Sequence, residues 1–203
     1  MNIIDFVLHF DVHLGEIILN YGKLTYAFLI TIVFAETGLV FTPFLPGDSL
    51  LFASGMFSAT GSLNVGILFF SLWAASFLGD NTNYWIGYYL GQKMVNNKKI
   101  PINQNHIDKT QHFFEKYGKK TIILARFMPI VRTFAPFVAG IGKMKYRDFA
   151  FFSFLGGLCW VGLFIFAGYF FGNIPVIRDN FSVVILGIIG ISVLPAIFKL
   201  IKR

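Results

Sequence analysis

Charged residues are scarce in this 203-residue sequence. Asp, Glu, Lys and Arg together make up 13% of it, whereas a soluble domain carries about 25%. Hydrophobic residues make up 56%, phenylalanine alone contributes 26 residues, and the mean hydropathy is +0.67. This composition argues against an ordinary soluble protein and indicates an all-α integral membrane protein, with residues 1–203 forming one membrane domain.

Three further absences narrow the possible functions. The single cysteine, Cys159, excludes a disulfide framework. Residues 1–20 contain three acidic residues but no Lys or Arg, so we expect no cleavable signal peptide. His9 and His13 are four residues apart, but no third ligand accompanies them, and we expect neither a metal nor a cofactor. In so apolar a chain, membrane orientation explains the net charge of +7 better than a nucleic-acid partner.

Three apolar runs approach the roughly 20 residues that a membrane-spanning helix requires: 62–90, 149–171 and 181–198. The polar residues of 3–20 recur at helical spacing, which predicts an amphipathic helix in the membrane interface. Residues 24–60 and 121–141 are also apolar, but prolines and charges interrupt them. Such a broken backbone survives in a membrane only inside protein or beside water, so both segments are predicted to be re-entrant hairpins.

Lysine and arginine positions predict the orientation. Thirteen of the 17 lie in 92–120, in 143–147 and at the C-terminus. Because cytoplasmic loops are enriched in positive charge, we expect all three regions to be cytoplasmic. The hairpin in 121–141 would then enter from the cytoplasm, and the hairpin in 24–60 from the outside.

The sequence contains a weak internal repeat. At an offset of 96 residues, YGKLT (21–25) matches YGKKT (117–121); at an offset of 81, GYYLG (87–91) matches GYFFG (168–172). The predicted architecture is an inverted repeat of interfacial helix, hairpin and span. Its parts are repeat 1 at about 1–91, a cytoplasmic loop at 92–105, repeat 2 at 106–172 and a C-terminal helix at 181–200.

The two offsets differ by 15 residues, which predicts a 15-residue insertion between 37 and 61 in the first copy. The offset of 96 also aligns Glu36 with Arg132. If the hairpins face each other within the membrane, these two opposite charges would meet.

Five ionisable residues lie in apolar segments, namely Glu36, Asp48, Asp80, Arg126 and Arg132. A charge at the bilayer centre costs at least about 2.5–3.5 kcal/mol. One interpretation is structural, with Glu36 and Asp48 neutralising the two arginines. The other is a pathway for a charged or polar species, and the two can coexist.

The residue types suit the second interpretation. Arginine grips phosphate in two places at once. A carboxylate in an apolar site can exchange a proton near neutral pH, although a nearby arginine favours its charged form. Pro129 and Pro136 break the helix and can leave amides for an anion. Asp80 and Tyr84 share one helix face with Gly87 and Gly91, which suits either a function or a glycine packing seam with a polar cap.

Three motifs resemble those of the DedA family, also described as SNARE-associated or VTT-domain membrane proteins. They are E-T-G with P-F-L-P-G-D-S (Glu36–Gly38, Pro43–Ser49), G-D-x-x-x-Y-x-I-G (Gly79–Gly87) and R-F-M-P-x-x-R-T-x-x-P-x-x-A-G (Arg126–Gly140). The resemblance implies a multi-pass protein of the bacterial inner membrane, with a cytoplasmic C-terminus and two facing hairpins.

The resemblance further implies transport of a lipid phosphate, most simply undecaprenyl phosphate, coupled to protons. Arg126 and Arg132 would hold the phosphate, and Glu36 and Asp48 would couple to protons. Supporting positions would be Asp80, Tyr84, Pro43, Pro46, Gly47, Pro129 and Thr133.

Other functions stay open from the residues alone. A phospholipid scramblase, a proton-coupled small-ion antiporter and a structural membrane factor fit the same charges, and the chain could form homo-oligomers. An enzyme acting on lipid phosphates fits poorly, because the apolar segments contain no histidine for a nucleophilic or metal centre.

Overall fold

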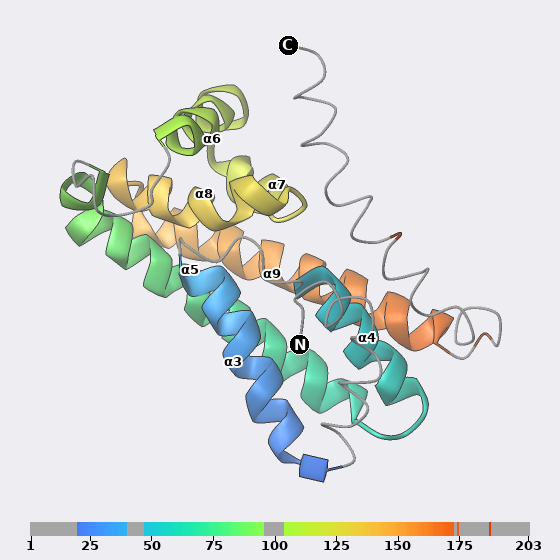
Figure 1. Cartoon of the computed structure of the whole chain (residues 1–203). Helices are drawn as coiled ribbons and strands as arrows, with labels where there is room; N and C mark the ends of the chain where they lie inside the picture. The colour runs from blue at the N-terminus through green and yellow to red at the C-terminus, as the bar shows by residue number, and fades with distance from the viewer. Residues whose placement is uncertain (1–19, 40–46, 96–103, 173, 175–186, 188–203) are drawn as a thin grey trace. The chain divides into compact units, whose positions relative to one another are not determined.

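A computed structural model describes residues 20–39, 47–95, 104–172, 174 and 187. Every regular element within this part of the chain is helical (Figure 1). The predicted interfacial helix at 3–20 and the C-terminal helix at 181–200 lie almost wholly outside the described residues, as do Pro43 and Pro46. The elements are α3 (Leu24–Gly38), α4 (Gly47–Ala59), α5 (Val65–Val95), α6 (Gln104–Tyr117), the short η1 (Gly118–Lys120), α7 (Thr121–Ala125), α8 (Pro129–Ile141) and α9 (Tyr146–Phe171).

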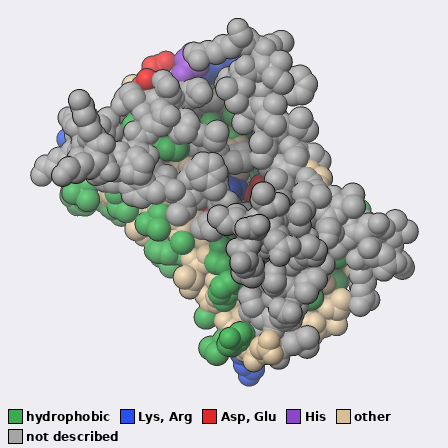
Figure 2. Space-filling model, viewed as in Figure 1, with side chains coloured by type: hydrophobic (Ala, Val, Ile, Leu, Met, Phe, Trp, Pro, Cys, Tyr) green, Lys and Arg blue, Asp and Glu red, His purple; other side chains and the backbone are tan. Residues whose placement is uncertain are grey.

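Two long helices correspond to two of the predicted spans. Helix α9 has 26 residues, about 39 Å at 1.5 Å per residue, and is long and apolar enough to cross a bilayer of about 30 Å. Helix α5 is longer, with 31 residues, but the polar residues of its second half reduce its apolar character. Figure 2 shows hydrophobic side chains along the edge where α5 and α3 are drawn in Figure 1. Those exposed on α5 include Ile67, Phe70, Leu78, Trp85 and Tyr89, which suits contact with lipid.

The predicted hairpin segments contain short helices. Helices α3 and α8 have 15 and 13 residues, about 22 and 20 Å, and neither is long enough to cross the bilayer alone. Helix α8 begins at Pro129, because proline has no N–H to lose at the first position and its fixed φ suits a helix start. Pro136 lies inside α8 and removes one backbone hydrogen bond there, but the helix continues through it to Ile141, so the expectation that Pro136 breaks the helix is wrong.

Helix α6 forms the polar cover of this part of the chain. It is amphipathic, and it lies against α8 (Figure 1), where Ile107 and Phe114 pack with Phe137 and Val138. An amphipathic helix therefore precedes the second hairpin segment, where the repeat predicts one.

The chain divides into two compact units, and neither is a continuous half of the sequence. The first comprises 1–31, 46–72 and 161–203; the second comprises 32–45 and 73–160. The first unit therefore combines α4 with the end of α9, and the second combines α8 with the greater part of α5. Each unit thus draws on both predicted sequence repeats.

Both units contain the same close helix crossing. In the first, a Cβ on Gly168 of α9 would overlap the carbonyl of Phe52, and one on Gly55 of α4 would overlap the carbonyl of Ile165. In the second, a Cβ on Gly87 of α5 would overlap the carbonyl of Phe137. A Cβ on Gly140 of α8 would likewise overlap the carbonyl of Tyr84. Glycine is required at all four positions because backbone meets backbone there.

These contacts align the two copies residue by residue. Gly87 corresponds to Gly168 at the predicted offset of 81, whereas Gly55 corresponds to Gly140 at an offset of 85. Gly22 and Gly118, 96 residues apart, both have positive φ, +50° and +58°. The offset thus falls from 96 to 85 across the hairpin and from 85 to 81 across the following turn, so the extra 15 residues divide into 11 and 4.

This division changes one expected equivalence. Glu36 lies in α3, before the extra residues of the hairpin, and Arg132 lies in α8, after them. The offset of 85 that holds in α8 aligns Arg132 with Gly47 and Thr133 with Asp48. On the offset of 85, Glu36 and Arg132 do not occupy equivalent positions, because the two predicted hairpin segments differ in length.

The glycine crossings give a first prediction. Gly55→Ala and Gly140→Ala should each destabilise the protein by about 1–3 kcal/mol, because the added methyl must separate two backbones. Gly162→Ala in α9 is the matched control, since its nearest side-chain atom would lie at an ordinary 3.4 Å. Thermal unfolding in detergent measures the three variants; equal midpoints for all three would contradict the close crossings.

Candidate functional site

Two of the sequence motifs meet where α3 ends on α5. A Cβ on Gly38 would lie 3.3 Å from the Cα of Gly79, and one on Gly79 would overlap the hydroxyl oxygen of Thr37. The absence of side chains at both glycines lets the end of α3 approach α5 closely. As a result, the E-T-G residues of α3 lie beside the G-D residues of α5, within the second unit.

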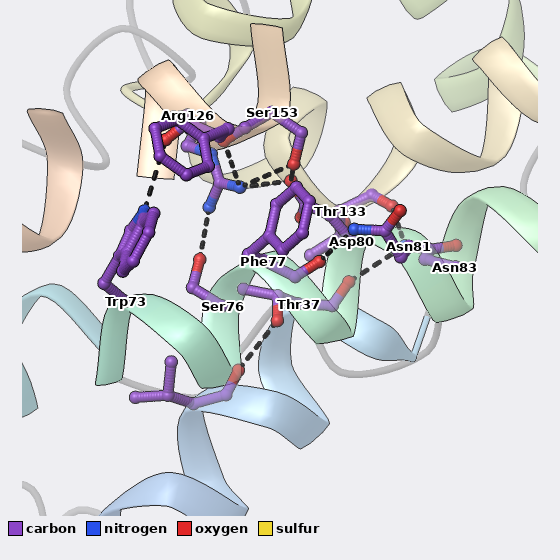
Figure 3. A network of polar contacts seen from close by, with 12 residues as sticks. Thr37, Trp73, Ser76, Phe77, Asp80, Asn81, Asn83, Arg126, Thr133 and Ser153 are labelled. Carbon is purple, nitrogen blue, oxygen red and sulfur yellow. Dashed lines mark hydrogen bonds and ion pairs between the residues drawn. The ribbon is translucent and has the colours of Figure 1, made fainter. Parts of the chain in front are cut away.

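Arg126 lies in the break between α7 and α8 and anchors a buried polar network (Figure 3). Its guanidinium donates through Nη1 to Ser76 Oγ at 2.5 Å and through Nη2 to Asp80 Oδ2, with which it forms an ion pair. Ser153 Oγ donates to the same carboxylate oxygen at 2.6 Å. Arg126 is 2% exposed and Asp80 3% exposed, so the pair is shielded from water.

Arg132 forms a second buried ion pair in the same unit. Its Nη2 donates to Oε1 of Glu36, which reaches it from α3. Glu36 is fully buried and Arg132 is 5% exposed. The contact between Glu36 and Arg132 that the sequence predicted is therefore present, although the two residues do not occupy equivalent positions in the repeat.

Asn83 joins the two broken helices. Its side-chain amide donates to the carbonyl of Thr37 at 3.1 Å and to the carbonyl of Thr133 at 2.8 Å. One side chain of α5 thus holds the end of α3 against α8 (Figure 3). Asn83 Oδ1 and Arg126 Nε are buried and make no hydrogen bond to a protein atom.

Trp160 of α9 lies close to both arginines. The centroid of its indole is 4.7 Å from the Cζ of Arg132 and 5.8 Å from the Cζ of Arg126. The ring is fully buried. Two guanidinium groups therefore share the neighbourhood of one aromatic ring, whose electron-rich face attracts cations.

The cluster is close to electrically neutral, since two arginines face two carboxylates. Each arginine faces a carboxylate on a different helix, so the pairs connect α3 to α8 and α5 to the α7–α8 break. Burying four charges in this way is tolerable only because each has a hydrogen-bonded partner of opposite sign. Because Nη2 of each arginine already donates to a carboxylate oxygen, an anion that used either Nη2 would compete with Glu36 or Asp80.

The remaining predicted residues fall into several places. Thr133 contributes its carbonyl to the cluster, and Pro129 begins α8. Tyr84 lies apart from the ion pairs: its hydroxyl donates to the carbonyl of Met144 at 2.5 Å, and its ring stacks on Phe149. Gly47 and Asp48 begin α4 in the first unit, where Asp48 is partly buried.

The partner of Arg126 is Asp80, whereas the structural interpretation of the sequence assigned Asp48 a neutralising role. The sequence predicts only a supporting role for Asp80. It does not identify four further residues of the cluster, namely Ser76, Asn83, Ser153 and Trp160. Spacing offers a signal for the residues of α5, because Ser76, Asp80 and Asn83 are four and three residues apart and share one helix face. Nothing in the sequence connects Ser153 or Trp160 of α9 to the cluster.

Among the described residues, no group of three His, Cys, Asp or Glu side chains could hold a metal ion. The buried cluster combines guanidinium, carboxylate, hydroxyl and amide groups from α3, α5, α8, α9 and the α7–α8 break. Together with a helix that can span a bilayer and two short apolar helices, it defines a class: helical membrane proteins with an ionisable interior.

The chain belongs to the DedA family. The model of the VTT domain matches residues 45–170. The chain is 52% identical over 204 residues to Protein DedA of Escherichia coli strain K12, covering 99% of this chain and 93% of the relative. It is 42% identical over 180 residues to an uncharacterized membrane protein of Mycobacterium tuberculosis strain H37Rv, covering 87% of this chain and 79% of that one.

A third relative supports the location. The inner membrane protein YqjA of Escherichia coli strain K12 is 34% identical over 152 residues, covering 74% of this chain and 69% of YqjA. Relatives named as membrane and inner membrane proteins support a location in the bacterial inner membrane. No solved structure matches the chain.

The buried pair gives a second prediction. Asp80→Ala should destabilise the protein by about 3–5 kcal/mol, because it leaves Arg126 charged, buried and without its carboxylate. Asp148→Ala is the control: its pair with Lys119, 2.5 Å apart, is largely exposed, and its loss should cost at most about 1 kcal/mol. Thermal unfolding of both variants in detergent measures the difference, and similar losses would contradict the burial of the Arg126–Asp80 pair.

Proposed function

We propose that this protein translocates a lipid phosphate across the inner membrane, with protons as the coupling ion. The observation that carries the proposal is the pair of buried arginines, Arg126 and Arg132, in the membrane domain. Each faces a carboxylate that can be protonated. Arginine suits phosphate recognition because its planar group donates two parallel hydrogen bonds. Undecaprenyl phosphate is the substrate that the family resemblance implies.

The charge balance of the cluster supports a role for protons. A phosphate monoester carries about −1.5 to −2 charges near pH 7. Adding it to a cluster of two arginines and two carboxylates leaves an excess of negative charge in a buried site. If Glu36 and Asp80 take up protons, each arginine loses its competing partner and can turn to the phosphate. Proton uptake and anion binding would then favour each other.

The broken helices supply the polar path. Helices α3 and α8 are too short to cross alone, and irregular backbone is tolerated at membrane depth only inside protein or beside a water-filled cavity. We propose that they belong to two re-entrant hairpins in an inverted repeat. The repeated glycine crossings support the repeat. A lipid headgroup would pass along the hairpins while its tail stays in the bilayer.

The orientation of the chain in the membrane is part of the proposal. The basic residues favour a cytoplasmic location for the segments 92–120 and 143–147 and for the C-terminus.

Asp48 would exchange protons on α4, in the first unit. Its position matches that of Thr133 in the second unit.

A structural role is the second candidate, and a specific observation favours it. Both arginines already have carboxylate partners, so the pairs could serve only to fix α3, α5 and α8. Exchanging the charges distinguishes the two roles. A structural pair should tolerate Glu36→Arg combined with Arg132→Glu, whereas a phosphate site should not, because the arginine would then be held by α3. A small-ion antiporter, in turn, predicts flux driven by a pH gradient in vesicles without the lipid phosphate.

The third prediction concerns transport. In vesicles containing labelled undecaprenyl phosphate, Arg132→Ala should reduce translocation at least about tenfold, because removing a charge-assisted contact of 1.5–3 kcal/mol changes binding by that order. Glu36→Gln should retain some translocation but lose its response to a pH gradient, because glutamine keeps the shape and cannot take up a proton. Asp148→Asn, in the exposed pair with Lys119, is the matched control.

The same vesicles should be run with and without a pH gradient, and with phosphatidylglycerol in place of the polyprenyl phosphate. Equal transport of both lipids would indicate a scramblase. Unchanged translocation in Arg132→Ala and Glu36→Gln would overturn the proposed function.

A further inference from the structure

The two arginines of the cluster carry like charges, yet both lie beside the same ring. The Cζ atoms of Arg132 and Arg126 are 4.7 and 5.8 Å from the centroid of Trp160. Both distances fall within the roughly 6 Å over which a cation is attracted to an aromatic face. Tryptophan gives the strongest attraction of the aromatic side chains. The ring thus offers a neutral partner to two cations that would otherwise repel each other.

Local packing keeps the ring and the arginines together. Trp160 is fully buried on α9. On the preceding turn, a Cβ at Gly156 would lie 3.3 Å from Nε of Arg126, and one at Gly157 would lie 3.5 Å from its Nη2. The two glycines therefore let the Arg126 side chain lie along α9. Because the indole does not titrate, its attraction to a cation does not depend on whether the carboxylates are charged.

We propose that Trp160 is a positioning residue of the phosphate site, holding Arg126 and Arg132 together when their carboxylates are neutral. The inference rests on the proposed function. When a lipid phosphate replaces Glu36 and Asp80 as the partner of the arginines, the indole is a contact that both arginines keep in the bound and unbound states. It keeps both guanidinium groups near one point, so that one phosphate can contact both. A headgroup phosphate is the ligand class that this convergence fits.

A hydrophobic role for Trp160 would depend on size alone, whereas this role depends on the charge distribution of the ring. Fluorination separates the two, because it weakens the electron-rich face and changes the ring volume little. The chain has three tryptophans, Trp73, Trp85 and Trp160. In the variant Trp73→Phe/Trp85→Phe, fluorotryptophan incorporated during expression is therefore confined to position 160.

The fourth prediction is that KM for undecaprenyl phosphate rises stepwise as fluorines are added at position 160, while the maximal rate changes less. Vesicles of phosphatidylethanolamine and phosphatidylglycerol containing the lipid phosphate give both constants. Trp160→Leu should raise KM by about three- to thirtyfold, the range expected for losing a cation–π contact. Trp160→Phe should lie between tryptophan and leucine, because phenylalanine keeps a weaker electron-rich face.

Trp73 provides the matched control. Its indole N–H donates to the carbonyl of Phe154 at 3.2 Å, so it also packs against α9 in the same unit. In the variant Trp85→Phe/Trp160→Phe, fluorotryptophan is confined to position 73. Its KM should equal that of the same variant made with ordinary tryptophan. A rise there as large as at position 160 would overturn the inference.

The remaining outcomes separate the inference from the proposed function. If the wild type transports the lipid but KM is unaffected by fluorination at 160, or Trp160→Phe and Trp160→Leu are equal, Trp160 is not a positioning residue. If the wild type transports no lipid phosphate, the proposed function fails. Trp160 emission in detergent, titrated with undecaprenyl phosphate, then tests the inference alone. Affinity that falls with fluorination supports it, and a lack of binding overturns it.

Discussion

The second unit depends on one constraint: a charge buried at membrane depth must have a partner of opposite sign. Isolated, each of the four ionisable groups in the cluster would cost several kcal/mol. Arg132 and Glu36 meet one requirement by joining α8 to α3, and Arg126 and Asp80 meet the other by joining the α7–α8 break to α5. Segments too short to be membrane helices alone are thereby fixed to a long one, so the charges that interrupt the apolar segments also hold them in place.

Close packing of backbone makes these ion pairs geometrically possible. The side chain of Glu36 is short. It reaches Arg132 only because α3 approaches α5 closely at Gly38 and Gly79. The crossing at Gly87 and Gly140 sets α8 against α5 in the same unit. A Cβ at Gly79, Gly87 or Gly140 would overlap an atom of the neighbouring helix, so a larger residue there must separate helices that position the charged residues. The motif glycines therefore act on the charged residues at a distance, through helix separation rather than through contact.

The sequence predicted the features that depend on local composition. Hydrophobic length predicted the two long helices, Pro129 predicted the break before α8, and the offset of 81 aligns Gly87 with Gly168, which make the same close contact in the two units. It also predicted the contact of Glu36 with Arg132, although through an alignment that the hairpin lengths do not support. The sequence could not predict which carboxylate pairs with Arg126. Asp48 and Asp80 are both apolar-segment carboxylates, and only the three-dimensional approach of α5 to the α7–α8 break selects Asp80.

Neutrality of the cluster has a consequence for any transported anion. A site with two arginines free of carboxylates would bind phosphate tightly and release it slowly. Arginines that are already paired with carboxylates bind it less tightly, because each pair must first be broken. Binding must then be strong enough to replace an ion pair, and release is assisted when the carboxylates regain their charge. In the proposed transport, such exchange would keep the affinity for the lipid phosphate moderate, because a carrier must load on one side of the membrane and unload on the other. The same pairs that stabilise the fold would thus set the condition for turnover, since a carboxylate that cannot regain its charge cannot displace the lipid.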